Sequence, residues 1–100
     1  MHIHNVYFWL EDDLDKEALN SFEQGLKSLC VISDVKSGFF GKPAKTDRDV
    51  VENSYTYGLV LMFEDLNAHD TYQSSPVHEQ FIAEHRSKWI LAVVHDIETI

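Results

Sequence analysis

The chain of 100 residues has one cysteine, two prolines, four glycines and only eight lysine and arginine residues. A single cysteine, Cys30, excludes an intrachain disulfide and a zinc site built from several thiolates. Eight basic residues against 17 acidic ones give a net charge of −9. This charge argues against nucleic acid or an anionic membrane as partner, because both attract clustered cations.

The sequence also has no apolar run near the roughly 18 residues of a membrane span and no signal-peptide pattern at its start. These features and the cysteine usage indicate a cytoplasmic protein. The composition does predict a buried core, since 44% of the residues are hydrophobic and 12% are aromatic. We expect one domain over residues 1–100.

The spacing of apolar residues predicts strands over residues 3–10, 31–40, 55–63 and 89–97. A helix over residues 14–29, capped by Asp13, follows the first strand, and an exposed loop over residues 42–53 follows the second. Asp65 begins a short helix, and Ser75 caps another that has Pro76 at its first position. This order predicts an α+β fold with a ferredoxin-like β-α-β-β-α-β antiparallel sheet and helices on one face.

Two of the predicted strands are apolar on both faces. Residues 55–63 and 89–97 do not alternate between apolar and polar side chains, as strands of a sheet with one wet face do. Helices cover one face only, so we expect a second copy of the chain to cover the other, giving a homodimeric α+β barrel. The alternative is an aromatic surface that binds a different protein.

The first strand places His2, His4, Val6 and Phe8 on one face, because side chains alternate. The other face is bulkier, with Ile3, Tyr7 and Trp9. We therefore predict that the bulkier face lies under the helices and that His4 points into the barrel lumen, as a ligand contact or as a hydrogen-bonded core histidine. His2 and His4 could together clamp a metal ion, but the sequence places no third ligand. We expect no metal and no cofactor.

His78 falls near the third position of the helix that begins at Pro76. The amide dipoles there disfavour a charged imidazole, so the ring should be neutral near pH 7 and suited to act as a general base. Tyr72 lies across the turn and could donate a hydrogen bond, and Asp96 in the last strand could orient the His78 ring. The alternative is a polar plug that satisfies the turn around Pro76.

The segment Tyr72-Gln73-Ser74-Ser75-Pro76-Val77-His78, preceded by Leu61-Met62-Phe63-Glu64-Asp65-Leu66, resembles the stress-responsive A/B barrel (Dabb) family. His4, Gly38, Gly41 and Asp96 also match its pattern. The resemblance implies a ferredoxin-like dimeric α+β barrel. One plant branch of the family includes a polyketide cyclase, in which the residues matching Tyr72 and His78 act on the substrate. This chain departs from that branch at Tyr57, where the branch has histidine, and at Glu23, where it has an aromatic residue.

We therefore expect a homodimeric Dabb-like barrel that binds a small, partly apolar molecule in its lumen. The alternatives are a non-catalytic scaffold and a cofactor-independent polyketide-cyclase-like lyase, with His78 as general base, Tyr72 as hydrogen-bond donor and Asp96 as orienting group. A monooxygenase of similar architecture fits less well, because the turn from Tyr72 to His78 is the Dabb signature. The residues expected to line the ligand pocket are His4, Val6, Phe8, Tyr57, Leu59, Ala92 and Val94.

Overall fold

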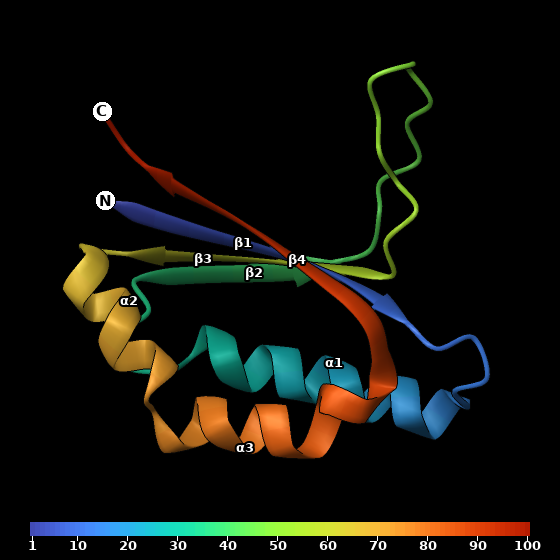
Figure 1. Ribbon diagram of the computed structural model, residues 1–100, viewed down its shortest axis with the longest axis horizontal. Coiled ribbons are helices and arrows are strands. Elements are labelled where there is room, and N and C mark those ends of the chain that lie inside the picture. The colour runs from blue at the N-terminus through green and yellow to red at the C-terminus, as the bar shows by residue number, and fades with distance from the viewer.

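The computed structural model describes all 100 residues as a four-stranded antiparallel sheet with its helices on one face (Figure 1). The strand order in the sheet is β2-β3-β1-β4, which is ferredoxin-like and confirms the expected α+β class. The elements along the chain are β1 (His2–Leu10), α1 (Lys16–Cys30), β2 (Ser37–Gly41), β3 (Tyr57–Phe63), α2 (Leu66–Gln73), α3 (Pro76–His85), the short 3₁₀ helix η1 (Arg86–Lys88) and β4 (Trp89–Glu98).

The helices begin where a side-chain oxygen meets a free backbone N–H. Asp65 accepts from the N–H of Ala68 at 2.9 Å and caps α2. Ser75 caps α3, which has Pro76 in its first turn, as expected. For α1 the predicted cap was wrong, because Asp15 and not Asp13 accepts the N–H of Ala18, at 2.8 Å. Two neighbouring acidic residues offer the same chemistry, and the path of the chain selects the second.

The second strand is shorter than its apolar run suggests. It begins at Ser37 and not at residue 31, because the residues after α1 form turns with their own backbone hydrogen bonds, from the N–H of Ile32 to Leu29 and from that of Val35 to Ile32. β3 likewise begins at Tyr57 rather than at residue 55. The loop expected over residues 42–53 is irregular and mostly exposed, and it projects from the sheet on the side away from the helices (Figure 1).

The face of β1 under the helices is opposite to the one that the sequence predicted. Burial alternates so that His2, His4, Val6, Phe8 and Leu10 are the buried residues. Side-chain volume was a poor guide, because the helices bring their own aromatic residues: Phe22 of α1 packs edge-on to Phe8, with ring centroids 5.3 Å apart. The bulkier side chains of β1 lie on the open face instead, where the Trp9 indole donates to Ser54 of the projecting loop.

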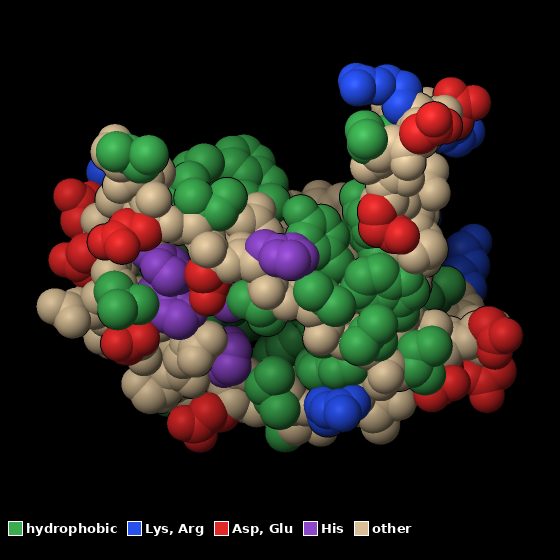
Figure 2. All heavy atoms as spheres, turned by 45° about the horizontal axis from the view of Figure 1, so that its top comes forward, with side chains coloured by type: hydrophobic (Ala, Val, Ile, Leu, Met, Phe, Trp, Pro, Cys, Tyr) green, Lys and Arg blue, Asp and Glu red, His purple; other side chains and the backbone are tan.

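The open face of the sheet has no helix over it (Figure 1). Leu91 and Ile97 of β4 lie opposite Trp9 and Ile3 of β1 in the sheet and are about half exposed. Figure 2 shows further hydrophobic side chains at the foot of the projecting loop. The strands that are apolar on both faces therefore leave one apolar face of the sheet uncovered within a single chain.

The core fills the space between the sheet and the helices. Phe22, Leu26, Leu61 and Phe63 are fully buried there. The longest helix has 15 residues, and no helix combines the length and the hydropathy needed to cross a membrane.

Candidate functional site

A cavity of about 170 Å³ lies between the sheet and the helices of one chain. Its walls are mainly apolar, and it opens to solvent on one side, where Val94 is 49% and Ile82 is 38% exposed. Its volume is of the order of an enclosed apolar cavity that holds benzene, about 150 Å³. The residues that line it are His4, Val6, Phe8, Leu29, Leu59, Tyr72, Gln73, His78, Phe81, Ile82, Trp89, Ala92 and Val94. The cavity is therefore of a size for a small, partly apolar molecule, with few polar groups to orient it.

Six of the seven side chains expected to line a ligand pocket do lie along this cavity: His4, Val6, Phe8, Leu59, Ala92 and Val94. The location differs from the expectation, however. These residues face the helices of their own chain, so the cavity is not in a lumen formed on the open side of the sheet. The seventh residue, Tyr57, is turned toward α1, where its hydroxyl donates to the carboxylate of Glu23.

Tyr72 and His78 meet at the helix-side wall of the cavity, as the turn between α2 and α3 predicts. Their rings are in edge contact, with centroids 4.9 Å apart. Burial lowers the pKa of His78, and the nearby His4 adds to the effect, so the ring is neutral at pH 7. Burial raises the pKa of the Tyr72 hydroxyl, which stays protonated. No hydrogen bond within the chain engages either group, so both are available to a molecule in the cavity.

Asp96 does not orient His78, contrary to the prediction. Its Oδ1 lies 2.6 Å from Nδ1 of His4, the residue opposite it in the sheet. Burial lowers the pKa of His4 despite this contact, so the neutral ring donates its Nδ1–H to the carboxylate. For Asp96, partial burial acts to raise the pKa, but the hydrogen bond with His4 prevails and the pKa is lowered. The cross-strand register, and not the helix turn, decides which imidazole Asp96 holds.

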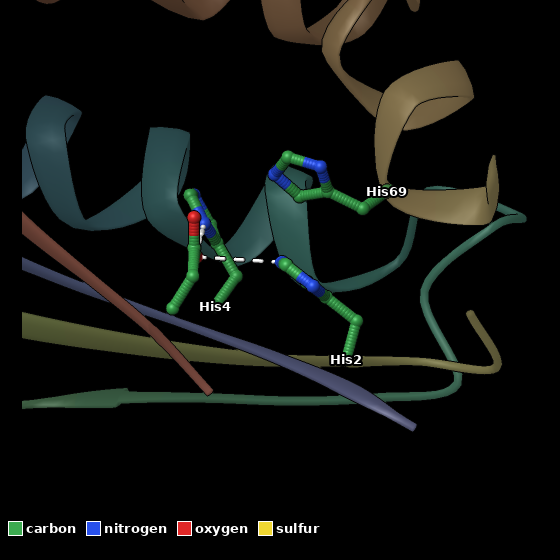
Figure 3. Close-up of side chains that lie close together, drawn as sticks. His2, His4 and His69 are labelled. Carbon is green, nitrogen blue, oxygen red and sulfur yellow. Dashed lines mark hydrogen bonds and ion pairs between the residues drawn. The ribbon is translucent and has the colours of Figure 1, made fainter. Parts of the chain in front are cut away.

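Two further histidines gather around this pair (Figure 3). His2 lies two residues before His4 on the same face of β1, and His69 comes down from α2. The ring of His69 lies 4.4 Å from that of His2 and 4.9 Å from that of His4, between centroids. One ligating atom from each of His2, His4, His69 and Asp96 falls within 4.8 Å of the others. We call these four residues the histidine cluster.

Sequence reasoning missed His69. It lies three residues before Tyr72 on α2, so the two share a helix face. This spacing was the available signal. What the spacing does not show is that α2 places His69 beside His2 and His4, at the start of β1.

Comparison with known proteins identifies a family whose model matches this chain. A family model described as the stress responsive A/B barrel domain matches residues 3–99. Among proteins with curated descriptions, none matches significantly.

Solved structures share the fold at low sequence identity. A protein from Arabidopsis thaliana is 20% identical, with a TM-score of 0.82, covering 100% of this chain and 96% of that one. A dimeric ferredoxin-like protein of unknown function from Thermobifida fusca is 18% identical, with a TM-score of 0.79 and coverage of 98% and 90%. A hydroxynitrile lyase from Passiflora edulis is 19% identical, with a TM-score of 0.78 and coverage of 99% and 95%. At this level of identity, the likeness establishes the fold alone.

Proposed function

The chain belongs to the stress responsive A/B barrel domain family, and from this premise we propose that it acts as a homodimer that binds a small, partly apolar molecule between its sheet and its helices. The observation that carries the proposal is the cavity itself, about 170 Å³ with a mainly apolar wall. Tyr72 and His78 stand at that wall with polar groups that no residue of the chain engages. Such a site binds a ligand by burying its apolar surface and orients it through one or two hydrogen bonds.

The dimer follows from the open face of the sheet. Apolar side chains of β4 are about half exposed there, although the helices fully cover the opposite side of β1 and β3. A second copy packed sheet against sheet buries this face through an isologous contact. The Thermobifida fusca relative is described as dimeric, which supports the same arrangement here.

Native mass spectrometry tests both parts of the proposal in one measurement. We expect a dimer, with a small organic molecule retained in some preparations. A monomer at micromolar protein concentration contradicts the argument from the open face.

Binding in the cavity is tested with phenol, which has an aromatic ring and one hydroxyl group. Saturation-transfer NMR should show contact between phenol and the wild-type protein. Val94→Phe enlarges a side chain that lines the open side of the cavity and is 49% exposed, and it should weaken the signal. The control is Val31→Phe, at a residue that is 76% exposed beyond the end of α1, and it should bind phenol as the wild type does. Equal binding by Val94→Phe refutes the assignment of the cavity.

A second candidate function is a cofactor-independent lyase, which the contact between Tyr72 and a neutral His78 favours. In such a step His78 takes the proton of a substrate hydroxyl, the carbonyl forms and the neighbouring carbon–carbon bond breaks. The released carbanion then takes up a proton, and Tyr72 donates a hydrogen bond to the developing charge. The shared fold with the Passiflora edulis hydroxynitrile lyase supports testing a cyanohydrin first.

The test follows benzaldehyde release from mandelonitrile by wild type, His78→Ala and Tyr72→Phe. A general base contributes about 10²- to 10⁴-fold, so His78→Ala should lose at least 100-fold in rate while the dimer and its thermal midpoint remain. If His78 is instead a structural plug, His78→Ala lowers the thermal midpoint and no variant, wild type included, turns over the substrate. Full activity in His78→Ala contradicts the lyase assignment.

A further inference from the structure

We propose that the histidine cluster is a binding site for one transition-metal ion of the zinc class. The site consists of His2 and His4 from β1, His69 from α2 and Asp96 from β4 (Figure 3). The cluster adjoins the cavity, since His4 borders it and the His69 ring centroid lies 6.3 Å from that of Tyr72, but its donor atoms are different groups from those of Tyr72 and His78. Its test therefore does not depend on what the cavity binds.

The distances within the cluster suit one ion. Zinc bonds to histidine nitrogen and carboxylate oxygen are about 2.0–2.2 Å long, so the ligand atoms of a tetrahedral site lie roughly 3.3 Å apart. All the candidate atoms are already within 4.8 Å of one another. From 4.8 Å, the most distant pair would close by about 1.5 Å. Nδ1 of His4 and Oδ1 of Asp96, now 2.6 Å apart, would separate by about 0.7 Å as the ion replaces the Nδ1 proton.

Two buried nitrogens of the cluster make no hydrogen bond. They are the Nε2 atoms of His2 and His69; that of His2 lies 3.4 Å from Oδ1 of Asp96 (Figure 3), and that of His69 has no partner in the chain. Buried polar atoms without a partner are rare in folded proteins, and each one asks for an explanation such as an ion. Both atoms belong to the same cluster, and a cation bound between them satisfies both at once.

The surroundings of His69 are those of a metal ligand. Its other ring nitrogen, Nδ1, lies 3.2 Å from the carboxylate of Asp70. A proton held there by the carboxylate leaves Nε2 with a free electron pair that is directed into the cluster. Metal-binding histidines commonly have such a carboxylate on the second nitrogen, which orients the ring and raises its basicity.

An acidic opening leads to the cluster from the protein surface. A cavity of about 290 Å³ beside it is lined by Met1, His2, Asp65, Leu66, Asp96 and Glu98. Figure 2 shows acidic side chains next to a group of histidines on this part of the surface. The three carboxylates and the net charge of −9 favour the approach of a cation.

The ligand types select the metal. Three imidazoles and one carboxylate suit zinc and its transition-metal neighbours, whereas magnesium and calcium prefer sites made of oxygen atoms. The competing explanation is a polar plug held together by hydrogen bonds. It accounts for the bond between His4 and Asp96 and for the 3.4 Å approach of His2 to Asp96, but it leaves the buried Nε2 of His69 without a partner.

The experiment is a calorimetric titration of chelator-treated protein with zinc chloride, using a histidine-free affinity tag. We expect one ion per chain for the wild type. Loss of a carboxylate that only orients a ligand costs about 10- to 100-fold in affinity, so His69→Ala, which removes a ligand, should weaken binding by about 100-fold or more. The matched control is His95→Ala, because His95 lies on the open face of β4, opposite Asn5 and outside the cluster; native mass spectrometry checks that this variant keeps the oligomeric state of the wild type. It should bind zinc as the wild type does, and magnesium should not bind to any of the proteins.

Cobalt provides an independent spectroscopic measurement. Cobalt bound by the four residues in tetrahedral geometry should give intense visible absorption bands, which His69→Ala loses and His95→Ala keeps. His2→Gln, near the start of β1, serves as a second variant if His69→Ala does not fold. The proposal is overturned if the wild type shows no saturable binding of zinc, or if His69→Ala or a folded His2→Gln binds zinc as tightly as His95→Ala.

Discussion

Gly38→Ala is predicted to destabilise the protein, because α1 ends directly against β2. A Cβ atom at Gly38 would lie 2.9 Å from Cβ and 3.0 Å from Cα of Cys30, and 2.9 Å from Cδ2 of Leu61. The Cα of Cys30 is part of the helix backbone and its Cβ is bonded directly to that Cα, so no side-chain rotation can move these two atoms away. Overpacking of this kind costs about 1–3 kcal/mol, and replacing glycine within a strand recovers about 0.5–1 kcal/mol.

The central values of these two ranges leave a net loss of about 1.3 kcal/mol. For a chain of this size, it corresponds to a fall of about 5–10 °C in the thermal midpoint. Circular dichroism during heating measures it, at one protein concentration because the midpoint of a dimer depends on concentration.

Gly41→Ala is the matched control for this prediction. It is the same substitution in the same strand, but no atom of the chain lies within 4 Å of the added carbon. Its free energy of unfolding should rise by about 0.5–1 kcal/mol, because the gain from replacing a strand glycine is then unopposed. If Gly38→Ala is as stable as the wild type, or if both variants lose the same amount, the close approach of α1 and β2 is not what requires glycine.

Three more perturbations follow from the fold. Asp15→Ala should lower the free energy of unfolding by about 1 kcal/mol in urea titrations, whereas Asp13→Ala, which caps nothing, should leave it unchanged. Phe22→Ala should cost about 3–5 kcal/mol by the same assay, because Phe22 is fully buried, and a loss below 1 kcal/mol would contradict its place in the core. Burial and the neighbouring Lys88 hold the pKa of His85 below 6.5, so on acidification His85 takes up a proton in the unfolded chain before it does in the folded one. The free energy of unfolding should therefore fall as the pH drops below about 6.5. His85→Gln should reduce this pH dependence, and an unchanged dependence would contradict the role of His85.

Much of the fold could be predicted because its signals are local. The apolar spacing of α1, the caps at Asp65 and Ser75 and the proline after Ser75 each act within one turn of chain. The boundaries were less accurate where two choices had similar local chemistry. Asp13 and Asp15 both offer a capping carboxylate, and residues 31–36 are apolar enough for a strand but form turns instead.

The site was predicted in part, and the errors share a cause. Tyr72 and His78 flank one short turn, so their proximity is close to a local property. Asp96 was assigned to the wrong imidazole because its partner depends on the register between β1 and β4. Which face of β1 lies under the helices depends on the aromatic residues that α1 supplies, and no pattern within β1 contains that information.

By itself, the sequence determined the α+β class, the apolar character of both sheet faces and the position of His78 at the start of α3. These depend on side-chain periodicity and on backbone capping, which operate over a few residues. Only the tertiary structure decided that the cavity lies beneath the helices and that α2 brings His69 to His2, His4 and Asp96. Residues separated by more than 90 positions, such as His4 and Asp96, become neighbours through sheet register and helix packing. Those depend on the fit of the whole core, which no short segment of the chain encodes.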